Sequence, residues 1–358
     1  MTSLPHYDIK RGTTASGLGW LCGAALCGAL VSLPFWAESG TLRLLVEFMC
    51  YLALAQMWNL LAGYGGLVSI GQQAFIGIGG YGLFVMANHA QINPFISVLA
   101  GGIIAALLAI PTAKIVFRLR GGYFAIGTWV MAEVYRLSVS NVPLVGGGSG
   151  QSLTALSGIA KGTRESVTFW IASALAIAAI AGTYWLLRSR FGIALTAIRD
   201  SEAAAESQGV DVARVKFTVY ILSAFGSGLV GALYYLNVLR ISPNSAFDLN
   251  WGVAAIFIVV IGGIGTIEGP IVGALIFFAM REMLSDYGSW YMMAMGVVAI
   301  VVMLKWPKGI WGTLQQHVDF RLFPLQRRVT ERPSVAPPRP GFDLAAKGID
   351  VADGPVQP

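Results

Sequence analysis

The stretch RSRFGIALTAIRDSEAAAESQGVDVARVK, from Arg188 to Lys216, is the one long polar and charge-dense interval between the apolar spans of this chain. Its alanine-rich composition favours a helix. The sequence on both sides is apolar enough to lie in a bilayer, so this charged segment is set aside on one face of a membrane protein. We therefore expect the segment to bind a partner, with this chain as the membrane half of a larger assembly.

The composition of the whole chain also indicates a membrane protein. Apolar residues make up 56% of its 358 residues, charged residues make up 12%, and the mean hydropathy is +0.67. The chain is thus far more apolar than a soluble domain and carries about half as many charges, which excludes a water-soluble enzyme. The positive-inside rule accounts for the net charge of +6, so nucleic acid is not expected as a partner.

Ten apolar stretches are candidates for crossing the bilayer. They cover residues 17–36, 42–61, 67–88, 95–117, 122–141, 168–187, 217–239, 251–267, 271–284 and 290–304. The last two are short, which leaves a re-entrant path open for either. The sequence predicts an all-α, polytopic membrane protein with about ten transmembrane helices and a charged helix on one face.

Three parts follow from these spans: an N-terminal segment (1–16), a transmembrane domain (17–306) and a tail (307–358) whose composition predicts disorder. An even number of spans places both termini on one side. With the termini inside, twelve basic residues before the tail lie inside and six lie outside, which predicts cytoplasmic termini and a cytoplasmic charged stretch. The inner residues are Lys10, Arg11, Lys114, Arg118, Arg120, Arg188, Arg190, Arg199, Arg214, Lys216, Lys305 and Lys308, and the outer ones are Arg43, Arg136, Lys161, Arg164, Arg240 and Arg281.

Two pairs of opposite charge lie in the predicted spans. Arg43 and Glu47 are four residues apart, and we expect them to pair at the membrane interface. Glu133 and Arg136 are three residues apart and therefore share one helical face, which predicts an ion pair.

Neither the cysteines nor the longest loop indicates a cofactor. Cys22, Cys27 and Cys50 lack CxxC spacing and nearby histidines, so we interpret them as packing residues. The loop 142–167 contains Gly146-Gly147-Gly148-Ser149-Gly150, but it lacks the lysine and hydroxyl residue of a P-loop and follows no predicted strand. A nucleotide site is not expected here.

The charged stretch, built as one continuous helix, carries small residues along one face. This face holds Ala194, Ala197, Ile198, Ser201, Ala205 and Gln208, whereas Thr196, Arg199, Glu202 and Glu206 lie off it. A low ridge of this kind fits a close groove in a partner, and the charged flank would set its orientation. The residues alone leave open a solvated loop between spans.

Five runs of sequence, in this order, resemble the LivM-like permeases, the membrane subunits of branched-chain amino acid ABC importers. They are WNLLAGYGGLVSIGQQAFIGIGGY (58–81), GGYFAIGT (121–128), the glycine-rich loop ending in GSG (148–150), FGIALTAIRD (191–200) and IGGIGTIEGP (261–270). The resemblance covers most of residues 45–305.

This resemblance implies a heteromeric importer in the bacterial inner membrane. Its other parts would be a second permease subunit, two cytoplasmic ATPase subunits that bind the ATP, and a periplasmic substrate-binding protein. This chain, surrounded by lipid, would bind no cofactor or metal and would carry no catalytic residue. It would translocate branched-chain or related amino acids, with discrimination between them mainly in the binding protein.

The resemblance also implies that Ala194 to Gly209 is the segment that docks into the ATPase. The coupling residues would then be Ala194, Ala197, Ile198, Arg199, Glu202, Ala204, Ala205 and Gly209. Importers of this kind carry Glu-Ala-Ala followed by a glycine at this place. Glu202-Ala203-Ala204 fits, whereas Gly209 comes one residue late, which leaves the register of docking open.

Two clusters of glycine are candidates for the substrate pathway. They comprise Gly63, Gly65, Gly66, Gly71, Gly77, Gly79 and Gly80 in the first cluster and Gly262, Gly263 and Gly265 in the second. Glycine lets helix backbones approach closely or marks a helix interrupted within the membrane, so plain helix packing is the alternative at each position. We expect leucine at Gly79 or Gly263 to impair transport more than leucine at Gly101 or Gly182.

The nearest alternative is a urea or short-amide permease of the same superfamily, which would share nearly all these motifs. Two other classes of function are less compatible with the sequence. An ion-coupled secondary transporter needs acidic or histidine residues within its spans, yet such acids are nearly absent and His6, His89 and His317 lie at or beyond span ends. A membrane-embedded enzyme would need a cluster of His, Asp and Glu that the sequence lacks.

Overall fold

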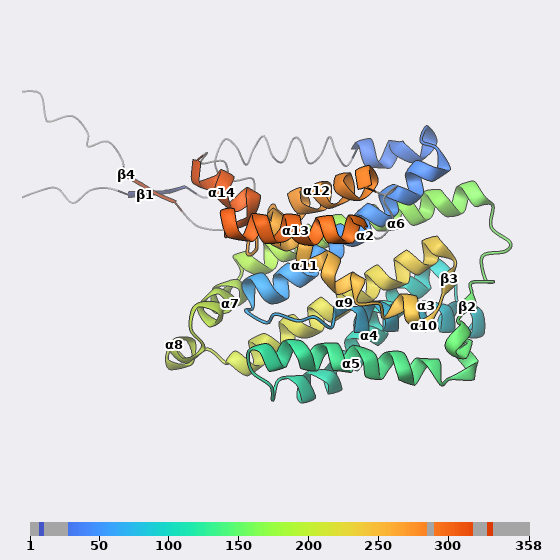
Figure 1. Ribbon diagram of the computed structural model, residues 1–358, viewed down its shortest axis with the longest axis horizontal. Coiled ribbons are helices and arrows are strands. Elements are labelled where there is room, and N and C mark those ends of the chain that lie inside the picture. The colour runs from blue at the N-terminus through green and yellow to red at the C-terminus, as the bar shows by residue number, and fades with distance from the viewer. Residues whose placement is uncertain (1–6, 11–27, 285–289, 318–327, 332–358) are drawn as a thin grey trace, which may run out of the picture.

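The computed structural model describes residues 7–10, 28–284, 290–317 and 328–331, and these are almost entirely helical (Figure 1). The helices are α2 (Ser39–Asn59), α3 (Gln72–Phe84), α4 (Pro94–Val116), α5 (Gly122–Ser140), α6 (Lys161–Arg188), α7 (Arg190–Asp200), α8 (Glu202–Ser207), α9 (Val212–Val238), α10 (Pro243–Ala246), α11 (Asn250–Gly262), α12 (Gly269–Leu284), α13 (Trp290–Lys305) and α14 (Gly309–His317). The π-helical turns Leu60–Tyr64 and Val85–His89 follow α2 and α3. Short 3-10 turns cover Leu33–Phe35, Pro143–Val145 and Gly147–Ser149.

Two pairs of short antiparallel strands complete the described structure. β1 (Tyr7–Lys10) pairs with β4 (Arg328–Glu331), so segments near the two ends of the chain meet. β2 (Gln151–Ser152) pairs with β3 (Arg240–Ile241). The glycine-rich loop before β2 fits closely against β3, because a Cβ atom at Gly150 would lie 2.0 Å from the carbonyl oxygen of Ile241. The loop is therefore a tight connection between elements.

Six described helical stretches are long and apolar enough to cross a membrane. They are Ser39–Tyr64, Pro94–Val116, Lys161–Arg188, Val212–Val238, Pro243–Gly262 and Met293–Gln315. The predicted all-α, polytopic membrane architecture is confirmed, whereas the predicted count of about ten transmembrane helices is not.

The remaining predicted spans differ for identifiable reasons. The span 67–88 has no regular structure up to Gly71 and then forms α3 and the π-helical turn that follows it, and this helical stretch has polar residues at both ends, Gln72 and Gln73 at its start and Asn88 and His89 at its end. α12 has only 16 residues. α5 carries the charges of Glu133 and Arg136 along its length. Most of the span 17–36 lies outside the described residues.

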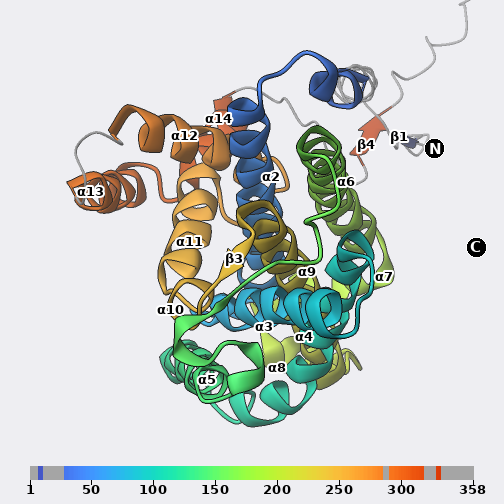
Figure 2. The same cartoon turned by 90° about the vertical axis from the view of Figure 1, so that its right-hand side faces the viewer.

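Helix α3 forms the centre of the molecule, and all of its residues are buried. It packs against α4, α5 and α9, while α2 packs against α6, α9, α11 and α12. Figure 2 shows α6 on one side of α2, with α12 and α13 on the other. The centre of the molecule is therefore α3, enclosed by α4, α5 and α9.

The connections between helices gather at two ends of the bundle. α7, α8 and α14 lie at the left of Figure 1, and β2, β3 and α10 lie at the right. At the right-hand end, Asn88 accepts the backbone N–H of Thr154 at 3.1 Å, and Arg136 donates to Asn244 at 2.9 Å. This arrangement agrees with chain segments that run alternately from one end to the other.

One predicted ion pair is confirmed and the other is wrong. Arg136 Nε lies 2.9 Å from Glu133 Oε2. Arg43 instead pairs with Glu165 of α6 at 3.0 Å, and Glu47 pairs with Arg281 of α12 at 2.8 Å. Because α6 and α12 flank α2 on different sides, each charge pairs with the helix that it faces.

The structure describes two parts of the predicted tail. Residues 309–317 form α14 and residues 328–331 form β4, while 318–327 and 332–358 lie outside the described residues. Cys50 is free and buried, in agreement with a packing role, and Cys22 and Cys27 lie outside the described residues.

Candidate functional site

The charged stretch lies at one end of the molecule and folds into two short helices, α7 and α8 (Figure 1). Ser201 separates them in an extended conformation, with φ −163° and ψ 115°. Its side chain accepts the backbone N–H of Ala204 at 3.3 Å, as an N-cap serine does. The prediction of one continuous helix is therefore wrong, because Ser201 starts a new helix.

The break turns part of the predicted docking face toward this chain itself. Ile198 is 2% exposed and Ala205 is 1% exposed, and both belong to the hydrophobic core. Ala194 and Ala197 are half-buried. A residue buried within its own subunit cannot be the contact surface for a partner, so the predicted face is wrong at Ile198 and Ala205.

Other residues of the segment form its exposed surface. Ile193 is 70% exposed, which is unusual for an apolar residue on a charged segment. On α8 the exposed residues are Glu202, Ala203, Ala204, Glu206 and Ser207. Glu202 also forms an ion pair with Lys216 at the start of α9, which fixes α8 against the bundle.

Gly209 ends α8 in a left-handed conformation. Its φ is +82°, and its N–H donates to the carbonyl of Glu206 at 2.9 Å. Glycine adopts this conformation without strain, which makes it the usual residue just after a helix. The position of this glycine thus follows from the length of α8.

Arg199 connects the charged segment to the glycine clusters. Its Nη1 donates to the carbonyl oxygen of Gly63 at 3.3 Å, and a Cβ atom at Gly265 would lie 3.3 Å from the same nitrogen. The Cα atom of Arg199 would lie 3.7 Å from a Cβ atom at Gly66. One arginine of α7 therefore touches both clusters.

The end of α2 holds the second cluster through side-chain amides. Asn59 accepts the N–H of Gly265 at 2.8 Å and donates to the carbonyl of Thr266 at 2.8 Å. Gln56 donates to the carbonyl of Ile267 at 2.7 Å. Both amides are fully buried, so they satisfy loop groups that water cannot reach.

Glycine is required where the two clusters meet. A Cβ atom at Gly63 would lie 2.7 Å from the nitrogen of Gly265, and one at Gly262 would lie 1.9 Å from the oxygen of Gly269. Gly263 has φ +137° and Gly265 has φ +74°. We call this contact of residues 63–66, residues 262–269 and Arg199 the junction.

The rest of the first cluster packs helices together. Cβ atoms at Gly71, Gly77, Gly79 and Gly80 would lie 2.1, 2.4, 2.0 and 2.7 Å from Thr128, Phe247, Gly228 and Tyr235, respectively. Within the junction, a Cβ atom at Gly65 would lie 2.7 Å from the oxygen of Leu61, in the same helical turn. Gly101 is packed as tightly as the glycines of the cluster, because its Cβ atom would lie 2.4 Å from the oxygen of Gly79, so it should not tolerate leucine either. Gly182, with nothing within 4 Å, remains a suitable tolerant site.

A buried polar network that the sequence did not assign joins α3 to α9. Gln72 donates to Ser223 at 3.1 Å and accepts from Ser227 at 3.0 Å, and Ser223 donates to the carbonyl of Met57 at 3.0 Å. The signal was present in the sequence, since Ser223 and Ser227 are four residues apart within an apolar span. In the described part of the chain, no three His, Cys, Asp or Glu side chains gather as metal ligands would.

Comparison with known proteins identifies the family. The family described as "Branched-chain amino acid transport system / permease component" matches residues 40–304. The chain belongs to this family. The matched range contains the junction, α7 and α8.

Curated relatives agree with this assignment. The permease is 28% identical over 313 residues to the high-affinity branched-chain amino acid transport system permease protein LivM of Salmonella typhimurium, and equally to that of Escherichia coli, with 80% of this chain and 73% of each relative covered. It is 24% identical over 295 residues to a probable LivM of Methanocaldococcus jannaschii, with 76% of this chain and 83% of the relative covered. No solved structure matches the chain significantly.

Proposed function

We propose that this permease is one membrane subunit of an ATP-driven importer of branched-chain or related amino acids. The observation that carries the proposal is the family match over residues 40–304, together with relatives that are named as branched-chain amino acid permeases. A second permease subunit, two ATPase subunits and a substrate-binding protein complete the assembly. The ATPase subunits bind ATP, and this chain binds no cofactor of its own.

The geometry supports a path by which ATP hydrolysis reaches the membrane. The exposed surface of α7 and α8 is where the ATPase docks. A movement of α7 shifts Arg199, which is bonded to Gly63 and lies against Gly265. Because the junction consists of irregular backbone at the end of α2 and between α11 and α12, it can rearrange without breaking a regular helix.

The proposed location is the bacterial inner membrane, with α7, α8 and α14 on the cytoplasmic side. The excess of Lys and Arg at the end that holds α7 supports this orientation. Both termini then lie in the cytoplasm, in keeping with the pairing of β1 with β4.

The test is uptake of labelled leucine into proteoliposomes that contain the permease with its partner subunits and binding protein. We expect uptake to require ATP and to be abolished when the ATPase subunits are omitted. ATP-dependent uptake of labelled urea or acetamide, with no uptake of labelled leucine, would favour a urea or short-amide permease. Uptake without ATP that collapses with the ion gradient would identify a secondary transporter.

A further inference from the structure

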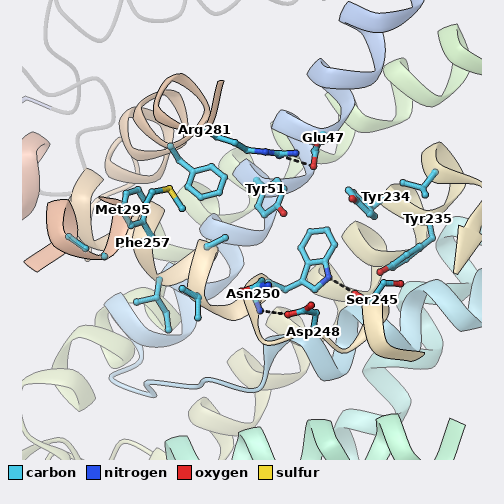
Figure 3. Close-up of a pocket in the computed structure, with 18 of the residues that line it drawn as sticks. Glu47, Tyr51, Tyr234, Tyr235, Ser245, Asp248, Asn250, Phe257, Arg281 and Met295 are labelled. Carbon is cyan, nitrogen blue, oxygen red and sulfur yellow. Dashed lines mark hydrogen bonds and ion pairs between the residues drawn. The ribbon is translucent and has the colours of Figure 1, made fainter. Parts of the chain in front are cut away.

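A cavity of about 500 Å³ opens between α2, α9, α11, α12 and α13, toward the end of the molecule that holds β3 (Figure 3). This volume lies in the range of about 300–1,000 Å³ that is typical of small-molecule sites. Its wall is largely aromatic. Tyr51 stacks on Trp251 at 5.1 Å between ring centroids, and Tyr234 meets the same indole edge to face at 4.6 Å.

Two opposite charges line the cavity below its rim. Glu47 lies eight residues, or about 12 Å, from the start of α2, and its Oε1 is 2.8 Å from Nη1 of Arg281. Their side chains are 19% and 37% exposed, so water reaches both only in part. The other charged residues of the lining, Arg240 and Asp248, are exposed at the rim.

The pair Glu47–Arg281 is suited to one class of ligand. A zwitterion offers an ammonium to Glu47 and a carboxylate to Arg281, so its entry replaces one ion pair by two and leaves no charge without a partner. A ligand with a single charge would leave either Glu47 or Arg281 unpaired in a poorly hydrated site, which is unfavourable. A neutral ligand could only hydrogen-bond to these two groups, and it would supply no opposite charge to either of them if it separated the pair.

We propose that this cavity is a transit site for a zwitterionic amino acid on its way through the permease. Glu47 binds the α-ammonium group, Arg281 binds the α-carboxylate, and the aromatic wall formed by Tyr51, Tyr234 and Trp251 contacts the apolar side chain. The inference rests on the proposed function and adds the place, and the two charges, by which the membrane subunit holds its substrate.

The molecule contains a matched control for the two charges. Arg43 and Glu165 form an ion pair of the same type at 3.0 Å. Arg43 lies on α2, one turn from Glu47, and Glu165 lies on α6. Neither residue lines the cavity. Glu165 is more buried than Glu47, with 6% of its side chain exposed. A purely structural effect of removing a carboxylate should therefore be at least as large at Glu165.

The experiment measures binding of labelled leucine to the purified importer in nanodiscs without its binding protein. The competitors are unlabelled leucine, 4-methylpentanoate, which lacks the amino group, and 3-methylbutylamine, which lacks the carboxylate. We expect leucine to compete at least tenfold better than either analogue. Glu47→Gln should remove the advantage of leucine over 4-methylpentanoate, and Arg281→Gln should remove its advantage over 3-methylbutylamine.

Glu165→Gln should keep the preference for leucine over both analogues. If Glu47→Gln does not accumulate, Glu47→Asp, which retains the charge, should accumulate and show the same preference as the wild type. The same preferences in the variants at Glu47 and Arg281 as in the wild type would overturn the transit site, as would equal loss in Glu165→Gln. Leucine uptake by the importer without leucine binding here would overturn the site while the proposed function stands. No uptake of branched-chain amino acids at all would instead refute the proposed function.

Discussion

Arg199 is the residue on which the proposed transfer of force from α7 to the junction depends. Replacing it by alanine removes the bond to the carbonyl of Gly63 and the contact with Gly265. The Arg199 side chain is 41% exposed, so the loss of stability should be small, about 0–1 kcal/mol. We expect Arg199→Ala instead to lower the leucine uptake per ATP hydrolysed, because α7 loses its side-chain link to the junction. ATP hydrolysis and leucine uptake by the same proteoliposomes provide the measurement.

The control is the neighbouring Asp200, whose carboxylate also bonds Arg199 but is 72% exposed. Exposed ion pairs contribute only about 0–1 kcal/mol, so Asp200→Asn should leave the ratio of uptake to hydrolysis nearly unchanged. Equal ratios in Arg199→Ala and the wild type would contradict a role of Arg199 in coupling.

Two glycines that look alike in sequence should respond in opposite directions to alanine. At Gly79 a Cβ atom would lie 2.0 Å from a backbone oxygen of Gly228, so Gly79→Ala should lower stability by about 1–3 kcal/mol through overpacking. At Gly182, within α6, nothing lies within 4 Å, so Gly182→Ala should raise stability by about 0.5–1 kcal/mol. Thermal unfolding of the purified variants tests both, and a common direction would refute the packing argument.

At the scale of elements, α8 separates the proposed docking surface from the residues that pack within the chain. Ala204 is exposed and Ala205 is 1% exposed. Ala204→Arg should accumulate normally and lose the ATPase subunit on purification. Ala205→Arg should reduce accumulation of the permease itself, because it buries an unpaired charge at a cost of several kcal/mol.

Ala155→Arg, an exposed site at the opposite end of the molecule, is the control and should retain the ATPase. If Ala204→Arg co-purifies with the ATPase as Ala155→Arg does, the exposed face of α8 is not the docking surface.

The elements also explain which predictions from sequence succeed. The apolar stretches of the sequence predicted most of α4, α6 and α9, because any helix that spans a bilayer must be apolar over a length of about 20 residues. The break at Ser201 was missed, although a serine followed by Glu202 is a helix start by its chemistry. The junction could not be predicted, since Asn59 and Gly265 are far apart in sequence and their contact depends on how α2 packs against α11.

At the scale of the whole molecule, the orientation in the membrane is open to a direct test. Ser207 ends α8 and Ser157 lies five residues after β2, two elements at opposite ends of the bundle in Figure 1, and both serines are exposed. With Cys22, Cys27 and Cys50 removed, a cysteine at position 157 should react with an impermeant maleimide added to intact spheroplasts. One at position 207 should react only after the membrane is opened, and equal labelling of both from outside would refute the orientation.

The partners of Arg43 and Glu47 have a consequence for the synthesis of the chain. Glu165 and Arg281 belong to α6 and α12, which leave the ribosome long after α2. During that interval α2 carries two charges in or near the membrane without their eventual partners. The helix therefore depends on water at the bilayer surface, or on the insertion machinery, until later helices arrive, and its final depth in the membrane is set late in biogenesis.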